Sequence, residues 1–411
     1  MSIRLKILVL AYACEPNKGS EPEVGWQWVK QLARKHDVWV ITRANNKIPI
    51  VNSGIFEKFS NLHFVYIDLP TWARFWKKGN RGIHLYYWLW QIVAVTRAWQ
   101  LHRVNCFNIT HHITFSPFYQ PPLISLLPIP FIWGPIGAGE KLPRRFFKLF
   151  NLRQKMKENI RTIIRLLSPF NPLVFLAFCR AKLILAATKE TYSVIPICFR
   201  HKAVVESQIG METVKQIYKI RDPNKPFKII SAGRHVYWKG GILIIRAFYK
   251  FVSETGISAE LHIISDGPEK TKFIREVNKL KIQDIVTFTN WFPRRDDVFS
   301  AYKKADIFAY ASLFECGGYV VLEALSVGLP IVCLDLGGPG EIVNKSCGCK
   351  VIAKNPEQVV NDLSSVFKAL SQDDTLLSSL SAGACSRVNM EFNWDLKGDR
   401  LHKLLSDRFS A

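Results

Sequence analysis

The fold of the chain is decided by a stretch near its start, residues 6–42, which reads KILVLAYACEPNKGSEPEVGWQWVKQLARKHDVWVIT. An apolar run at Lys6–Tyr12 leads into a polar loop that contains Gly19. Helical periodicity follows at Glu23–Lys35, and a second apolar run occupies Val38–Thr42. Short apolar runs that alternate with helical periodicity are typical of parallel strands covered by helices on both faces. The stretch therefore predicts a strand, a loop, a helix and a parallel strand.

The same alternation continues along the chain and predicts an α/β protein with two doubly wound halves. Residues 216–228 form a polar segment with two prolines, as expected of an interdomain linker. We expect a first domain at residues 1–215, a second domain at 229–388 and a closing helix at 389–411. The strands expected in the first half are Lys6–Tyr12, Val38–Thr42, Leu62–Ile67, Asn108–His112, Pro130–Trp133 and Leu183–Ala187. Those expected in the second half are Phe227–Ser231, Glu260–Ser265, Ile285–Thr289, Ile307–Tyr310 and Ile331–Leu334.

Length and composition fit this division into two large domains. The chain has 411 residues, and domains hold about 100 to 200 residues each. A hydrophobic share of 48% with 22% charged residues is that of a globular protein and argues against intrinsic disorder. The formal net charge is +23. We therefore expect attraction to polyanions, which include nucleic acid, acidic lipid head groups and phosphorylated substrates.

The nine cysteines are scattered and odd in number, which favours free thiols in a reducing, cytoplasmic compartment. Cys347 and Cys349 form the closest pair, but no second Cys or His pair stands nearby, so no metal site is expected. The apolar run Ile7–Ala13 is too short for a signal peptide. No run reaches the roughly 18 consecutive apolar residues of a transmembrane helix.

Two basic, aromatic segments depart from the pattern and predict a surface that binds an anionic membrane peripherally. Residues 71–103 contain six Lys or Arg, five Trp and no acidic residue, and residues 144–182 contain ten Lys or Arg with Glu158 alone opposing them. Cations mixed with aromatic side chains suit anionic lipid head groups. The alternative is that the aromatic side chains are core. Side chains expected at this surface are Trp72, Trp76, Trp88, Trp90, Trp99, Arg74, Lys77, Lys78, Arg81, Phe146, Phe147, Leu149 and Phe150.

Doubly wound halves bind ligands at the carboxyl ends of their strands, so candidate residues are sought there. The segment GRHVYWKG, residues 233–240, comes directly after the first expected strand of the second half. Its Arg234 and Lys239 are two fixed positive charges on a loop flanked by glycines, and they suit a diphosphate. The alternative is a solvated basic loop.

A second candidate is FECGGYVVLEALSVGLP, residues 314–330. Glu315 lies in a Gly-rich loop and Glu323 inside the helix that follows, so the turn can bring both carboxylates to one wall of a cleft, where they would accept hydrogen bonds from sugar hydroxyls. Gly317 and Gly318 leave backbone N–H groups at the helix N-terminus, which favours an anion. The alternative is one capping carboxylate and one exposed helical carboxylate.

The first half offers weaker candidates. Gly19 precedes a helix whose N-terminus could approach a phosphate or an acceptor, but a single Gly-Ser turn is not a dinucleotide fingerprint. His111 and His112 end the strand expected at Asn108–His112, and a pair at a strand's carboxyl end favours a place in the cleft. The alternative is that both are structural core residues.

In this order and spacing, the residues of the second half resemble the GT-B glycosyltransferases of family 4. The resemblance covers most of the chain and is strongest from about residue 228 to 344. It is carried by Arg234 with Lys239, Glu315 with Glu323, the turn Gly337-Gly338-Pro339, SDGPE at 265–269 and NWFPR at 290–294.

The resemblance implies two Rossmann-like domains that face each other across a cleft, with the helix at 389–411 packing back on the first domain. It implies transfer of a hexosyl unit from a UDP- or GDP-sugar to a glycan or lipid-linked acceptor in polysaccharide biosynthesis, with retained anomeric configuration. No metal and no other cofactor would be needed, because two cations can stabilise a departing nucleoside diphosphate.

The resemblance also implies individual roles. Arg234 and Lys239 would hold the donor diphosphate, Glu315 the hydroxyls of the transferred sugar, and Glu323 the ribose. One of His111 and His112 would face the sugar, and Glu140, in the Gly-rich segment 131–143, would act on the acceptor or cap a helix.

Two residues depart from the family pattern. Gly317 stands where a bulky residue is usual, and Ser265 stands where glycine is common. These departures bear on sugar preference more than on reaction class.

Two alternatives remain open from the sequence. A basic binding protein without catalysis would explain the charge, but no RNP, zinc-finger or helix-turn-helix signature is present, so nucleic acid is not expected as a partner. A GT-B sugar epimerase or phosphorylase would share the donor residues.

Overall fold

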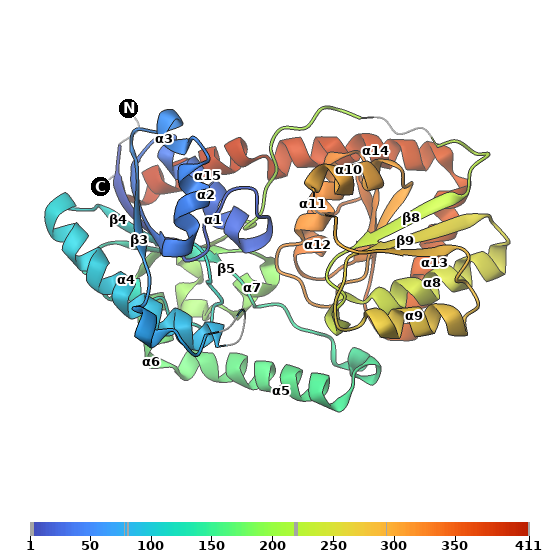
Figure 1. Cartoon of the computed structure of the whole chain (residues 1–411), viewed down its shortest axis with the longest axis horizontal. Coiled ribbons are helices and arrows are strands. Elements are labelled where there is room, and N and C mark those ends of the chain that lie inside the picture. The colour runs from blue at the N-terminus through green and yellow to red at the C-terminus, as the bar shows by residue number, and fades with distance from the viewer. Residues whose placement is uncertain (1–3, 78, 80–81, 218–220, 293, 410–411) are drawn as a thin grey trace. The chain divides into compact units, whose positions relative to one another are not determined.

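The computed structural model describes residues 4–77, 79, 82–217, 221–292 and 294–409 (Figure 1). Its chain divides into two compact units. Unit 1 consists of Met1–Gly139, Thr162–Gln208 and Trp394–Ala411, and unit 2 consists of Glu140–Arg161 and Ile209–Asn393. The segment expected as a linker, 216–228, therefore belongs to unit 2, and its residues 218–220 lie outside the described residues.

Unit 1 is built on a parallel sheet of seven strands, which in spatial order are β3 (Leu62–Ile67), β2 (Asp37–Arg43), β1 (Lys6–Leu10), β4 (Ile109–His112), β5 (Phe131–Ile136), β6 (Ala181–Ala186) and β7 (Ala203–Val205). Ile7, Leu8, Val9 and Leu10 of β1 are fully buried, because this strand lies inside the sheet between β2 and β4, with both faces covered. Helices assigned wholly to this unit are α1 (Ser20–Ala33), α2 (Lys47–Val51), α3 (Ile55–Lys58), α4 (Ile83–Asn105), α6 (Pro172–Arg180), α7 (Lys189–Val194) and α15 (Trp394–Phe409).

Unit 2 is built on a second parallel sheet, whose strands in spatial order are β10 (Val286–Thr289), β9 (Ala259–Ile264), β8 (Phe227–Ala232), β11 (Ile307–Tyr310), β12 (Ile331–Leu334) and β13 (Gly348–Val351). The strand order reverses where β8 pairs with β11, and ligands of such sheets bind at this point. Its helices are α8 (Gly241–Thr255), α9 (Lys270–Lys279), α10 (Arg295–Lys303), α11 (Tyr319–Ser326), α12 (Gly337–Ile342), α13 (Pro356–Gln372) and α14 (Asp374–Arg387), with a π-helical turn at Val388–Phe392. The helix α5 (Leu152–Leu167) contains the boundary between the units, after Arg161.

The sequence predicted all but two of these strands. It missed β7, which has only three residues, and β13, whose sequence GCKV is half polar. Both lie at one end of their sheet, where a strand has a single neighbour and needs less apolar surface. All nine cysteines are free thiols, including Cys347 just before β13 and Cys349 within it.

Part of the expected membrane surface is core. Phe146 and Phe150 are buried in the hydrophobic core of unit 2, and Phe147 and Leu149 pack against that core. The prediction that these side chains face lipid was therefore wrong for Phe146 and Phe150, whereas Phe147 and Leu149 are partly buried. Their burial also explains why residues 140–161 belong to unit 2 rather than to the expected first domain, 1–215.

The tryptophan group divides in the same way. Trp90 is fully buried in the core of unit 1, and Trp76 packs against that core, so the prediction was wrong for Trp90. Trp72 is 78% exposed. Lys78 and Arg81 lie outside the described residues. Among the described residues, no single helix meets the length and hydropathy of a membrane span, whereas the bent pair Leu152–Phe170 and Pro172–Arg180 meets them together.

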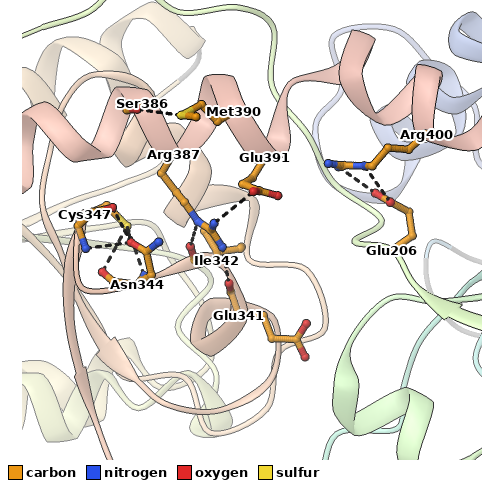
Figure 2. Close-up of polar contacts among 11 residues, drawn as sticks. Glu206, Glu341, Ile342, Asn344, Cys347, Ser386, Arg387, Met390, Glu391 and Arg400 are labelled. Atoms are coloured by element: carbon orange, nitrogen blue, oxygen red, sulfur yellow. Dashed lines mark hydrogen bonds and ion pairs between the residues drawn. The ribbon is translucent and has the colours of Figure 1, made fainter.

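The closing helix α15 packs within unit 1 through a buried cation. The Lys397 side chain is fully buried, forms an ion pair with Glu206 and donates to the carbonyl of Ser207 at 2.6 Å. Its Nζ also lies 5.2 Å from the ring centre of Trp28 on α1. Arg400, one turn further along α15, pairs with the same Glu206 (Figure 2). Burial lowers the pKa of Lys397, and the carboxylate opposes that shift.

Figure 2 also shows how α14 is tied to α12 within unit 2. Arg387 donates to the carbonyl oxygens of Ile342 and Glu341, at 2.9 and 3.1 Å. These are the last carbonyls of α12, which have no partner inside their own helix. The contact fixes the far end of the helix whose first residues, Gly337 and Gly338, belong to the candidate site.

Replacing Lys397 by Met tests this anchor. The variant leaves the Glu206 carboxylate with Arg400 alone, and removal of one partner of a buried ion pair costs about 3 to 5 kcal/mol in the free energy of unfolding. Urea unfolding followed by circular dichroism measures the loss. Lys403→Met, on an exposed position of the same helix, is the control and should unfold like the parent. If both variants unfold like the parent, the buried pair does not stabilise unit 1.

Candidate active site

A cluster of polar side chains in unit 2 is formed by residues at the end of β11 and in the loops that follow β8 and β11. Lys239 ends a short 3-10 helix after β8, Tyr310 is the last residue of β11, and Glu315 lies in the next loop. The ammonium of Lys239 lies 2.5 Å from the Tyr310 hydroxyl and forms an ion pair with Glu315. The Tyr310 hydroxyl donates to the same carboxylate oxygen of Glu315 at 2.8 Å. A cation, a phenol and a carboxylate therefore meet at the switch point of the sheet.

Arg234 lies at the same edge, on the loop directly after β8. Its side chain is exposed and makes no ion pair with any described residue. A small pocket is lined by residues of this loop, among them Gly233, Arg234, His235 and Lys239, and by Tyr310. Arg234 and Lys239 thus line one pocket, and Arg234 makes no ion pair within the described ranges.

His235 is a wall residue of this pocket that the sequence analysis missed. It is buried, and in the described part of the chain neither ring nitrogen has a hydrogen-bond partner. Burial lowers its pKa, so the ring is neutral at pH 7. The sequence did contain a signal for this role, because His235 directly follows Arg234 in the segment 233–240 at the end of a strand.

The Glu315 loop is held in place by the Gly-rich turn at α12. Gly338 N–H donates to the carbonyl of Glu315 at 2.9 Å. A Cβ on Gly337 would lie 2.2 Å from that same carbonyl oxygen, so a larger residue there would displace the loop. Gly318, the N-cap of α11, has a φ of 89°, which only glycine adopts without strain. Gly317 lies between Glu315 and this cap, so the glycines position the carboxylate.

Glu323 lies on α11 and is paired within unit 2. Its side chain is 15% exposed and forms an ion pair with Arg295 of α10, with 3.2 Å between the Arg295 nitrogen and the Glu323 oxygen. Burial raises its pKa, and Arg295 opposes the shift. Arg295 was not predictable from the sequence, because the spacing of residues along α11 does not indicate a partner on the neighbouring helix α10.

The histidine pair of unit 1 is buried within its sheet. His112 contacts the Tyr87 hydroxyl at 2.7 Å through Nε2 and the Ser116 hydroxyl at 2.8 Å through Nδ1. His111 Nε2 lies 2.7 Å from the carbonyl oxygen of Gly134, and its Nδ1 has no partner among the described residues. Burial lowers the pKa of His111 to about 4 and that of His112 to about 3. Both rings are therefore neutral at pH 7 and offer hydrogen bonds rather than charge.

The remaining candidates fall in different units. Gly19 is the N-cap of α1 in unit 1, and a Cβ there would meet nothing within 4 Å. Glu140 is buried and belongs to unit 2, where its Cγ lies 3.2 Å from the position of a Cβ on Gly337. Glu140 thus stands beside the turn that holds the Glu315 loop. Among the described residues, no group of three His, Cys, Asp or Glu side chains is placed to hold a metal.

A comparison with known protein families matches part of unit 2. Residues 214–374 match the family model described as glycosyl transferases group 1, and the matched segment contains Arg234, Lys239, Glu315 and Glu323. The match supports the resemblance to group 1 glycosyltransferases over this segment.

Two relatives illustrate the similarity. The N-acetyl-alpha-D-glucosaminyl L-malate synthase of Bacillus anthracis is 32% identical over 133 residues, covering 32% of this chain and 33% of that protein. The putative colanic acid biosynthesis glycosyltransferase WcaL of Escherichia coli is 24% identical over 215 residues, covering 51% of this chain and 52% of that protein. The chain thus spans between a third and about half of the length of these relatives.

The fold is shared with a solved structure over nearly the whole chain. Anabaena Alr3699/HepE, solved in complex with UDP, superposes with a TM-score of 0.64 at 14% identity, covering 98% of this chain and 100% of that one. The predicted GT-B fold, with its two parallel sheets of seven and six strands, is thereby confirmed.

The buried histidines predict an acid-sensitive fold. Their pKa values in the folded chain, about 4 and about 3, lie below the value of about 6.5 in an unfolded chain. Below about pH 6.5 the unfolded chain binds protons that the folded chain does not, so each ring removes up to about 1.4 kcal/mol of stability per pH unit. Above that pH both states are neutral and the effect is absent.

We expect His112→Asn to be less stable than the parent at pH 7, because contacts to Tyr87 and Ser116 are weakened. Between about pH 6 and about pH 4.5 the variant should lose less stability than the parent, since one buried imidazole is gone. Denaturant unfolding at each pH measures both values. An equal acid-induced loss in the two proteins would contradict the neutral, buried state of His112.

Proposed function

We propose that the protein is a glycosyltransferase that moves a hexosyl unit from a nucleoside diphosphate sugar to a glycan or lipid-linked acceptor. The observation that carries this proposal is the meeting of Lys239, Tyr310 and Glu315 at the switch point of the unit 2 sheet, with Arg234 exposed beside them. Two cations and a carboxylate suit a diphosphate joined to a sugar.

The proposed donor is a UDP- or GDP-sugar. Support comes from the group 1 match over unit 2 and from the fold of HepE, which was solved with UDP. Arg234 and Lys239 would contact the diphosphate, and Glu315 the hydroxyls of the transferred sugar. Glu323 would accept hydrogen bonds from the ribose once Arg295 yields part of its contact.

The proposed chemistry is leaving-group stabilisation. The bond between the anomeric carbon and the β-phosphate oxygen breaks, and the electron pair goes to the diphosphate, whose growing charge Arg234 and Lys239 offset. The acceptor oxygen forms the new bond on the same face of the sugar, so configuration is retained, and its proton goes to the departing phosphate oxygen. Two fixed cations perform this task without a metal. A contact of His111 or His112 with the sugar stays a prediction.

The proposed setting is the cytoplasmic face of a membrane, in the assembly of a surface glycan. Free thiols at the exposed positions Cys106, Cys179 and Cys198 suit a reducing compartment. WcaL, the relative named for colanic acid biosynthesis, supports a polysaccharide acceptor. The acceptor would then be a growing glycan, carried on a lipid.

Three variants test the donor site. Arg234→Ala and Lys239→Ala each remove a charge-assisted contact of about 1.5 to 3 kcal/mol, so UDP and GDP should bind roughly 10- to 150-fold more weakly. Glu315→Gln should keep nucleotide affinity or raise it, because Lys239 loses its competing partner, while slow hydrolysis of the nucleotide sugar falls. Isothermal titration and a hydrolysis assay measure the two effects.

The control is Lys303→Ala, an exposed cation on α10. It should change neither nucleotide binding nor hydrolysis, because Lys303 does not belong to the proposed donor site. If overall charge alone governed binding, this variant would also bind nucleotide more weakly. Nucleotide binding at parental affinity in both Arg234→Ala and Lys239→Ala would show that the donor diphosphate does not use this loop.

A further inference from the structure

The helix α5 is amphipathic, and its two faces differ in polarity and in charge. At about 3.6 residues per turn, Leu152, Met156, Ile160, Ile163 and Leu167 fall on one side of the helix. The opposite side carries four polar residues, which are Gln154, Glu158, Arg161 and Arg165. A helix on the surface of a water-soluble protein normally turns its apolar side inward.

The polar side of α5 is the one that contacts the protein. Glu158 is buried, accepts from the Tyr237 hydroxyl at 2.6 Å and pairs with Arg161 at 3.0 Å. Gln154 donates to Glu269 at 2.8 Å. In unit 1, Arg165 donates to the carbonyl of Gly139. These contacts fix the rotation of the helix about its axis.

The apolar side of α5 consequently faces out. Leu152 is 77% exposed, Met156 62% and Leu167 59%. The same surface continues after the helix, where Phe170 is 82% exposed, and onto α6, drawn with α5 in Figure 1. Its exposed apolar side chains are Leu152, Met156, Ile160, Ile163, Ile164, Leu166, Leu167, Phe170, Leu173, Phe175 and Leu176, which we call the α5–α6 face. An apolar surface of this extent is typical of an interaction site.

Charge decides which partner suits the α5–α6 face. Arg153, Lys155 and Lys157 flank the apolar row of α5, and the segment's one acidic residue, Glu158, is buried on the other side. A second copy of this chain would bring cations against cations with no exposed carboxylate between them. An anionic lipid surface offers both an apolar interior and the opposite charge.

We propose that the α5–α6 face docks on the leaflet of an anionic bilayer, with its apolar side chains in the boundary between head groups and acyl chains. The flanking lysines and arginine lie at head-group level, where long basic side chains reach phosphates. The helix lies in the plane of the surface, because a spanning orientation would pull Glu158 and Arg161 out of their contacts. The bent pair formed by Leu152–Phe170 and Pro172–Arg180 has the length and hydropathy of a membrane span, so it offers apolar side chains to the bilayer.

The inference does not rest on the proposed reaction, since it concerns binding of the folded chain to lipid. The test is sedimentation of the full-length protein with vesicles of phosphatidylglycerol and phosphatidylethanolamine, and with vesicles of phosphatidylcholine alone. The parent should bind the anionic vesicles, and raised salt should weaken that binding. The triple variant Met156→Gln, Ile163→Gln, Leu167→Gln should bind them at least roughly tenfold more weakly, because the inserted side chains are lost.

The matched control is the triple variant Ile48→Gln, Ile197→Gln, Ile352→Gln, which removes three apolar side chains outside the α5–α6 face that are 73%, 81% and 62% exposed. It should bind vesicles like the parent. Circular dichroism and UDP titration check that both triple variants are folded, so loss of vesicle binding with intact nucleotide binding separates this inference from the donor site.

Three outcomes would overturn the proposal. One is equal vesicle binding by the parent and the α5 variant, and another is absence of binding by the parent to any vesicle. The third is a parent that elutes as a dimer, and an α5 variant that elutes as a monomer, with no vesicle binding by either; a second copy would then be the occupant.

Discussion

The parallel arrangement of both sheets is the constraint on which the rest of the structure depends. Parallel strands send all loops after their carboxyl ends to one edge of the sheet, so residues far apart in sequence meet there. In unit 2 this brings Lys239, after β8, to Tyr310 and Glu315, at the end of β11 and beyond it. The pairing of β8 with β11 places these loops side by side. The topology of the sheet therefore brings these three side chains together, whatever their chemical type.

Lys239 and Glu315 are paired with each other, and the Tyr310 hydroxyl donates to the same carboxylate. Under the proposed function, a diphosphate would take over the cation and free Glu315 for the sugar hydroxyls. Such an exchange of charge partners would leave neither half-buried charge unpaired. The glycine turn at Gly337 and Gly338 keeps the Glu315 loop in place through this exchange.

Much of the fold was predictable because apolar runs and helical spacing repeat through the chain, and Arg234, Lys239 and Glu315 stand at strand ends that those runs define. The predictions that failed concern side chains whose burial depends on residues distant in the sequence. Phe146 and Phe150 look like an exposed aromatic row, and only the core of unit 2 explains their burial. The outward rotation of α5 is set by partners such as Tyr237 and Gly139, which its own sequence does not contain.

The central claim is that a nucleoside diphosphate binds at the carboxyl edge of the unit 2 sheet through Arg234 and Lys239. A crystal structure of the full-length protein with UDP tests it most directly. The account predicts phosphate oxygens within hydrogen-bond distance of both side chains, with the ion pair between Lys239 and Glu315 opened or lengthened. A nucleotide bound elsewhere on the chain, with that ion pair intact, would contradict it.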